Sequence, residues 1–301
     1  MPELPEVETV RRGLSELYVG RALQRVVVTG RRTVRRHPAA ALASLEGRKL
    51  LGVGRHGKYL LLQWGERKQR KGNPGPGPGR PGLLVVHLRM SGQLLAAQAG
   101  APKPAHTHAV LCFSEGRDVY FVDPRTFGEL FIACPALPVP TAAGLGRPLP
   151  SDLLPSELHH LGPDALRAEA RYLRQALAGK RAPLKSVLVD QRVLAGVGNI
   201  YADEICFSAK LRPDRAGGTL RPRELARLAA STRSVLEAAI AARGSTLVDQ
   251  RYRDLMGNGG LYQLQHKVYG RAGQACLSCG AEVQRLTLGA KKAYFCPRCQ
   301  R

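Results

Sequence analysis

Four cysteines near the C-terminus constrain the fold of this chain more than any other feature. They form the pattern C-x2-C-x16-C-x2-C. Each pair can place two thiolates on one tetrahedral Zn²⁺, and the residues between the pairs suit a β-hairpin. Disulfides are the alternative, but a cytosolic chain would not keep them. Four thiolates complete the zinc shell, so we expect one structural Zn²⁺ bound by Cys276, Cys279, Cys296 and Cys299.

The N-terminus carries a second chemical signal. Initiator methionine is normally removed before a small residue, which would leave Pro2 with a free secondary amine. The pKa of such an amine is about 8, against about 10.4 for a lysine side chain, so a larger fraction of the amine than of a lysine is unprotonated at neutral pH. A neutral amine can form a Schiff base, and Glu3 could carry the proton. A chance Met-Pro start is the alternative.

The charge of the chain points to a polyanionic partner. It has 46 Lys and Arg against 23 Asp and Glu, a formal net charge of +23. This excess indicates nucleic acid, although an arginine-rich codon bias contributes. No apolar stretch approaches the roughly 20 residues of a membrane span, and the N-terminus lacks an apolar signal region. We therefore expect a cytoplasmic protein with no membrane partner.

The hydrophobic pattern changes along the chain. After Leu4, apolar residues recur at helical spacing. Short runs rich in Val, Leu and aromatics then predict strands that form a sandwich or barrel, at 22–30, 58–64, 82–90, 108–113, 118–123 and 128–133. The Pro/Gly-rich run 66–82 predicts a mobile loop, and 135–156 predicts a linker. Helical stripes follow at 163–179, 183–194, 199–211 and 221–244.

Seven ordered motifs resemble formamidopyrimidine-DNA glycosylases. They are MPELPEVETVRRGL, GRHGKYLLL, HLRMSGQL, DPRTFGEL, LAGVGNIYADEICF, VYGRAGQAC and the zinc ribbon. The resemblance spans Pro2 to Cys299 and implies an α+β fold. That fold has an N-terminal antiparallel β-sandwich with an N-terminal helix, a helical domain with a helix–two-turn–helix motif, and a β-hairpin zinc ribbon. We place the three domains at 1–145, 146–262 and 263–301.

The resemblance implies a bifunctional glycosylase and abasic-site lyase of base excision repair. Its substrate is double-stranded DNA with oxidised purines (8-oxoguanine, formamidopyrimidines) or abasic sites, from which the target nucleotide is extruded. Pro2 would form the Schiff base, Glu3 would move protons, and Glu6 would hold the pocket. Lys58 matches the catalytic lysine of the family. A family arginine of the zinc hairpin falls on Lys291, or on Lys292 if the alignment shifts by one.

The resemblance also implies the DNA-binding residues. A filling trio would replace the extruded base, and the remaining residues would bind the DNA backbone. The trio matches Met90, Arg125 and Phe127, and the backbone contacts match His106, Lys180, Lys185 and Asn199. Core packing is the structural alternative for Met90 and Phe127. Asn199 could also cap its helix, which is compatible with a phosphate contact. The stretch 244–263 corresponds to a lid over the flipped base.

Two other functions stay open at this point. An endonuclease VIII-type enzyme would take oxidised pyrimidines, but it typically begins with a PEGPE-like run that differs from LPEVET. A non-catalytic zinc-ribbon protein would bind DNA without cutting it, and would not need the set formed by Pro2, Glu3 and Lys58. We expect a monomer that is associated with the nucleoid through DNA binding.

Overall fold

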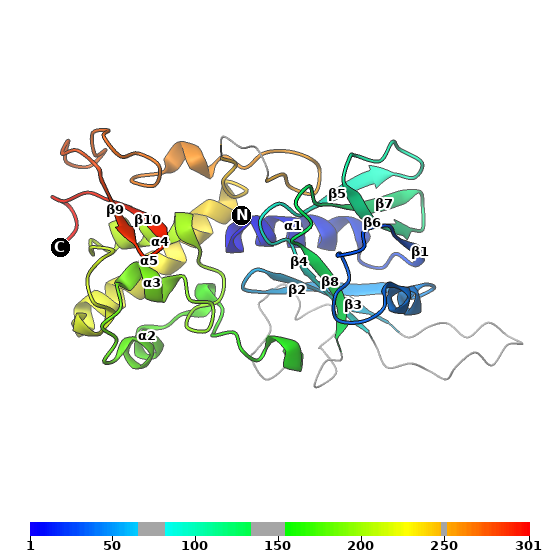
Figure 1. Ribbon diagram of the computed structural model, residues 1–301, viewed down its shortest axis with the longest axis horizontal. Helices are drawn as coiled ribbons and strands as arrows, with labels where there is room; N and C mark the ends of the chain where they lie inside the picture. Colours follow the sequence, from blue (N-terminus) through cyan, green and yellow to red (C-terminus); the bar gives the residue numbers. More distant parts are fainter. Residues whose placement is uncertain (66–81, 134–153, 248–251) are drawn as a thin grey trace, which may run out of the picture. The chain divides into compact units, whose positions relative to one another are not determined.

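The computed structural model describes residues 1–65, 82–133, 154–247 and 252–301 (Figure 1). The predicted loop and most of the predicted linker lie outside the described residues. The described chain divides into two compact units. Unit 1 holds residues 1–2, 6–159 and 246–260, and unit 2 holds residues 3–5, 160–245 and 261–301. The predicted domain boundaries stay a prediction.

Unit 1 contains two four-stranded antiparallel sheets (Figure 1). One has the order β1-β6-β7-β5 and the other the order β2-β3-β4-β8. The first sheet consists of β1 (Leu23–Val28), β6 (Thr107–Phe113), β7 (Arg117–Val122) and β5 (Gln93–Gln98). The second consists of β2 (Leu50–His56), β3 (Tyr59–Trp64), β4 (Leu83–His87) and β8 (Glu129–Ala133). The short helices η1 (Ala39–Leu45) and η3 (Ser156–Leu158) complete the unit.

Helix α1 (Leu4–Tyr18) and both sheets share one hydrophobic core. Alternate residues of β6 show how the core is formed: Leu111 and Phe113 face it, whereas Val110 faces the other side of its sheet. The Phe113 ring lies 4.7 Å from that of Tyr18 and 5.8 Å from that of Trp64, measured between centroids. The predicted N-terminal helix and antiparallel sandwich are therefore confirmed.

Two strands, β2 and β5, were not predicted from the sequence pattern. Strand β2 contains Gly52 and Gly54, which interrupt an apolar run, yet six of its seven residues are buried. Strand β5 is rich in Ala and Gln and has one fully buried residue, Leu94. Both strands are identified by their ladder hydrogen bonds to neighbours, a property that side-chain patterns report poorly.

Unit 2 is helical and carries the zinc ribbon (Figure 1). Its helices are α2 (Ala170–Leu177), α3 (Leu184–Leu188), α4 (Asn199–Ser208) and α5 (Pro222–Ala241), with short helices η4 (Ala165–Arg167), η5 (Gly217–Thr219) and η6 (Tyr262–Gln265). The predicted helix at 163–179 is therefore wrong in length, because the chain is extended at Ala168 and Glu169 between η4 and α2. Strands β9 (Gln284–Leu288) and β10 (Lys291–Phe295) form the predicted hairpin.

Part of the predicted lid belongs to the core of unit 1. Tyr252 and Leu255 are buried in its hydrophobic cluster, and the N–H of Ala96 donates to the Leu255 carbonyl at 2.7 Å. The Asp254 carboxylate closes the following turn by accepting the N–H groups of Met256 and Asn258. Over the described residues, no helix has both the length and the apolar character to cross a membrane.

Candidate functional site

Glu3 lies at the start of α4 in unit 2. Its carboxylate accepts the N–H of Gly198 at 2.7 Å and that of Ile200 at 2.9 Å, with a longer contact to Tyr201. A helix start presents unsatisfied N–H groups and a partial positive charge, and both favour a carboxylate. The side chain is 2% exposed. The residue that follows Pro2 is therefore fixed in one position.

The two glycines of the GVGN turn permit this approach. A Cβ on Gly198 would lie 2.3 Å from Glu3 Cδ, and a Cβ on Gly196 would lie 2.5 Å from the Leu4 side chain. Gly196 also has φ +113°. The predicted tight turn is present, and its glycines make room for the N-terminal residues.

Asn199 is the first residue of α4 rather than its cap. The cap is Gly198 and it has no side-chain cap bond, so the capping alternative for Asn199 is wrong. Within the described parts of the chain, the buried Oδ1 of Asn199 has no hydrogen-bond partner. Oδ1 only accepts hydrogen bonds, so the predicted phosphate contact would use the Asn199 side-chain NH₂ or the N–H groups at this helix start, and it stays a prediction.

Lys58 lies in the β2–β3 turn of unit 1 and is 5% exposed. The turn is anchored to α1 through Arg55, whose Nε donates to Glu8 at 3.0 Å and whose Nη1 donates to the Gly57 carbonyl at 2.9 Å. Arg11 also pairs with Glu8. Glu6 is buried in α1, and Pro2 is buried in the segment that precedes this helix. The ion pairs hold the lysine-bearing turn on α1, the helix that begins two residues after Pro2.

His87 is a residue that the sequence reasoning missed. Burial and the charges of Arg89 and Lys58 lower its pKa well below the ordinary value, so the imidazole is neutral at pH 7. The N–H of Arg89 donates to His87 Nδ1 at 2.9 Å, which places the ring proton on Nε2. A neutral N–H donor thus lies in the field of Lys58. The only sequence signal was an imidazole at the end of an apolar strand.

The filling trio of unit 1 is exposed. Met90 and Phe127 are 43% and 41% exposed, so the core-packing alternative is wrong for both. The Arg125 guanidinium lies 4.8 Å from the centroid of the Phe127 ring. Large apolar side chains at this exposure are available to a partner. His106 is exposed as well, in the turn before β6.

The predicted basic contacts of unit 2 divide into two classes. Lys180 is exposed after α2, and Lys291 and Lys292 are exposed on β10. Lys185 is 1% exposed: its Nζ pairs with Asp203 at 2.8 Å and donates to the Lys292 carbonyl at 2.5 Å. Burial raises the pKa of Asp203 to about 7, against the pull of Lys185. In this structure Lys185 holds β10 instead of facing solvent.

The four cysteines converge as the sequence predicted. Their Sγ atoms all lie within 4.8 Å of one another, and the closest pairs are 3.5 Å and 3.9 Å apart. Four sulfurs at about 2.3 Å from a tetrahedral zinc would lie about 3.8 Å apart. The N–H groups of Ser278 and Cys299 point at cysteine sulfurs, which favours thiolates. The donor set fits one structural zinc ion.

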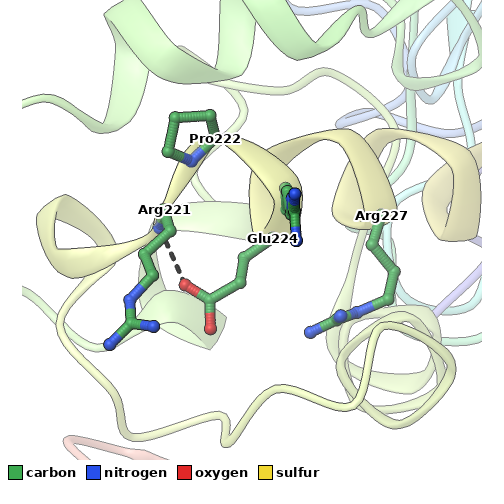
Figure 2. A pocket seen from close by; sticks show the side chains of 5 residues that line it. Arg221, Pro222, Glu224 and Arg227 are labelled. Carbon is green, nitrogen blue, oxygen red and sulfur yellow. Dashed lines mark hydrogen bonds between the residues drawn. The ribbon is translucent and has the colours of Figure 1, made fainter.

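A basic pocket at the start of α5 contains none of the predicted residues. Figure 2 shows Arg221 and Arg227 on either side of Glu224. The Arg221 N–H donates to Glu224 at 2.7 Å, and Arg215 also pairs with this carboxylate. Arg227 donates to the Ala209 carbonyl. The pocket is thus lined by side chains engaged in the capping of α5 and in its attachment to the end of α4.

Comparisons with known proteins cover the whole chain. Family models match residues 1–130 (formamidopyrimidine-DNA glycosylase N-terminal domain), 161–251 (its H2TH domain) and 273–301 (zinc finger found in FPG and IleRS). A formamidopyrimidine-DNA glycosylase of Corynebacterium jeikeium is 40% identical over 304 residues, covering 100% of both chains.

Solved structures agree with this sequence similarity. The MutM (Fpg) protein of Thermus thermophilus is 40% identical, with a TM-score of 0.77 over 99% of this chain and 98% of that chain. Lactococcus lactis Fpg, solved with DNA that contains N7-benzyl-Fapy-dG, is 30% identical, with a TM-score of 0.81 over 100% of both chains.

Proposed function

Because the chain belongs to the formamidopyrimidine-DNA glycosylase family, we propose that it is a bifunctional DNA glycosylase and abasic-site lyase. Its substrates would be oxidised purines, 8-oxoguanine and formamidopyrimidines, in double-stranded DNA. The observation that carries the proposal is the placement of Glu3, the residue that follows Pro2 in the chain, whose carboxylate is held by the N–H groups of Gly198 and Ile200. Amine catalysis with proton transfer requires a carboxylate held in a defined position, and Glu3 is one residue away from the candidate amine in the chain.

The reaction would begin at Pro2 after removal of Met1. Its nitrogen attacks C1′ of the extruded nucleotide, the N–C1′ bond forms, and the glycosidic bond breaks as the base leaves with a proton. Ring opening of the sugar gives an iminium ion, and Glu3 would move the protons that this step requires. The iminium acidifies the C2′ proton. Loss of that proton expels the 3′ phosphate, and a second elimination expels the 5′ phosphate.

Three further groups would assist these steps. Lys58 would place its ammonium group near the phosphate of the lesion, where positive charge stabilises the leaving oxygen. The neutral Nε2–H of His87 would donate to the same backbone. Lys291 or Lys292 would support the second elimination from the zinc hairpin, as a point charge without the two-pronged donor set of an arginine.

The exposed side chains of unit 1 would keep the duplex open. Met90 and Phe127 would fill the space left by the extruded base, and Arg125 would bond the orphaned base. His106, Lys180, Lys185 and Asn199 are proposed as backbone contacts. For Lys185, this requires that its buried pair with Asp203 opens on DNA binding. The zinc ribbon would present β10 to the DNA.

Borohydride trapping tests the proposal. Duplex DNA with 8-oxoguanine opposite cytosine should give a covalent adduct, and peptide mapping should place the crosslink on Pro2. The matched control is a variant with one alanine inserted between Met1 and Pro2, so that Pro2 is no longer the N-terminal residue after Met1 is removed. It should bind the duplex but give no adduct. Absence of any adduct from the unmodified protein, on lesion and abasic DNA alike, would show a non-catalytic DNA-binding protein instead.

A second substrate class has a specific observation behind it. The Fpg of Lactococcus lactis was also solved with DNA containing an oxidised pyrimidine, and this chain is 30% identical to it with a TM-score of 0.80. Single-turnover excision rates should show whether oxidised purines or oxidised pyrimidines are the preferred substrates. Faster release of thymine glycol than of 8-oxoguanine would assign the chain to pyrimidine repair.

A further inference from the structure

Asp123 is a fully buried carboxylate at the end of β7 in unit 1. Its Oδ1 accepts the Ser91 hydroxyl at 2.5 Å and the Arg125 N–H at 3.2 Å. Its Oδ2 accepts the Gly128 N–H at 2.7 Å. Over the described residues it makes no ion pair. Hydrogen bonds alone therefore stabilise this buried charge, which makes each of them costly to lose.

The same residue also connects a third loop through its backbone. The Asp123 N–H donates to the His106 carbonyl at 3.0 Å, and the Asp123 carbonyl lies 2.9 Å from His108 Nε2. The carbonyl further accepts the Thr126 N–H at 3.2 Å. One residue thus ties together the segments 88–92, 105–108 and 123–128.

Each of the three segments contains a non-glycine residue with positive φ. These are Arg89 (53°), His106 (63°) and Thr126 (53°). Such conformations are strained for residues other than glycine and persist only where the surroundings enforce them. Arg89 directly precedes Met90, and Thr126 separates Arg125 from Phe127. The strained residues therefore set the direction of the exposed side chains.

We propose that Asp123 and Ser91 are positioning residues that hold Met90, Arg125 and Phe127 ready to enter the DNA stack. The inference rests on the proposed function. Met90 and Phe127 come from different turns, and the hydrogen bonds Ser91–Asp123–Gly128 form a buried polar link between those turns, next to the partly exposed Arg89–Glu129 ion pair. The local packing leaves little freedom: a Cβ on Gly128 would lie 2.6 Å from the Phe121 ring. The link fixes the filling side chains before DNA arrives.

The test uses Ser91→Ala and Asp123→Asn in the full chain. Ser91→Ala removes one donor, and Asp123→Asn replaces one acceptor oxygen with an NH₂ group. Each should slow excision of 8-oxoguanine from duplex DNA by about 10- to 100-fold. Trapping at an abasic site in single-stranded DNA, where no stack must be opened, should stay within about 3-fold of wild type. A 2-aminopurine beside the lesion should show slower unstacking.

Matched variants separate positioning from general damage. Ser91→Thr keeps the hydroxyl and should restore duplex excision. Ser114→Ala loses a serine contact to Ala22 at the other end of the β6–β7 hairpin and should behave as wild type. The fluorescence of Trp64 reports whether unit 1 is folded, and if Asp123→Asn fails to fold, Ser91→Ala carries the test.

The experiment distinguishes failure of the positioning proposal from failure of the proposed function. A wild-type protein that traps neither substrate overturns the proposed function. A wild-type protein that is active, together with Ser91→Ala and Asp123→Asn variants that open and excise the duplex lesion at wild-type rates, overturns the positioning role alone. Equal loss on duplex and single-stranded substrates would likewise overturn it, because that pattern indicates damage to the reacting centre.

Discussion

Replacing Glu204 with glutamine should loosen the segment that leads into the zinc ribbon. Glu204 lies on α4 and is 2% exposed. Its Oε1 accepts the N–H groups of Val268 and Tyr269 at 3.0 Å and 2.8 Å, and its Oε2 accepts that of Lys267 at 2.9 Å. Glutamine has one acceptor oxygen, and its NH₂ group would face a backbone N–H. At least one buried donor then loses its partner.

The expected loss of stability is the cost of the lost hydrogen bonds minus the desolvation cost that is recovered when the charge is removed. A hydrogen bond to a charged group contributes about 1.5–3 kcal/mol, and stranding a buried donor costs about 1–3 kcal/mol. Burial raises the pKa of Glu204 although the N–H groups of Tyr269, Lys267 and Val268 lower it. Removing the charge therefore recovers part of its desolvation cost. We expect a net loss of about 2 kcal/mol, which is roughly a 30-fold increase in the open fraction of this segment.

Two readouts assign the effect to its unit. Trp64 is the only tryptophan of the chain and lies in β3, so its fluorescence follows unit 1. A chromophoric chelator follows zinc release from the ribbon. In Glu204→Gln, zinc release should shift to lower urea concentration while the Trp64 transition stays in place. Glu237→Gln, an exposed change on α5, is the control. Zinc release that matches wild type would refute the reasoning.

Three other perturbations have defined outcomes. Burial opposes ionisation of Glu8, but Arg11 and Arg55 outweigh it and hold its pKa below the ordinary 4.5; its stabilisation is present above about pH 4.5 and lost on further acidification. The urea midpoint of Trp64 fluorescence should therefore fall between pH 6 and 3.5, and less so in Glu8→Gln. Zinc chelation should abolish DNA binding, measured by anisotropy, and leave the Trp64 transition unchanged; a shifted transition would mean that the ribbon stabilises unit 1. DNA affinity should fall with salt at a log–log slope of about −4.5, given roughly five phosphate contacts, and a flat response would contradict the interpretation of the +23 charge as a DNA-binding surface.

Elements with strong side-chain periodicity could be predicted from the sequence. The spacing of Val7, Val10 and Leu14 gave α1, and dense apolar runs gave six of the eight strands of unit 1. The spacing of the four cysteines gave a complete ligand set, because CxxC geometry is local. Strands β2 and β5 were missed since backbone pairing, rather than a side-chain pattern, defines them.

Residues whose surroundings come from distant segments could not be predicted. The sequence predicts that Lys185, two residues after Pro183, is an exposed basic residue. In the structure it pairs with Asp203, which is 18 positions away on another helix. From the sequence His87 is an ordinary strand residue, but burial and the charges of Arg89 and Lys58 lower its pKa, and apart from Arg89 these surroundings come from other segments. The linking role of Asp123 depends on hydrogen bonds to residues 32 and 17 positions before it. Long-range pairing of polar groups leaves no periodic trace in a sequence.

The contact between Glu3 and α4 makes the first residues of the chain a structural part of a domain encoded some 200 residues later. Among the described residues, Gly198, Ile200 and Tyr201 already give their N–H groups to this carboxylate, whereas no hydrogen bond uses the Asn199 N–H. A chain shortened to begin at Leu4 would lose more than its reactive amine. Helix α4 would then start without its anion, and unit 2 would be less stable.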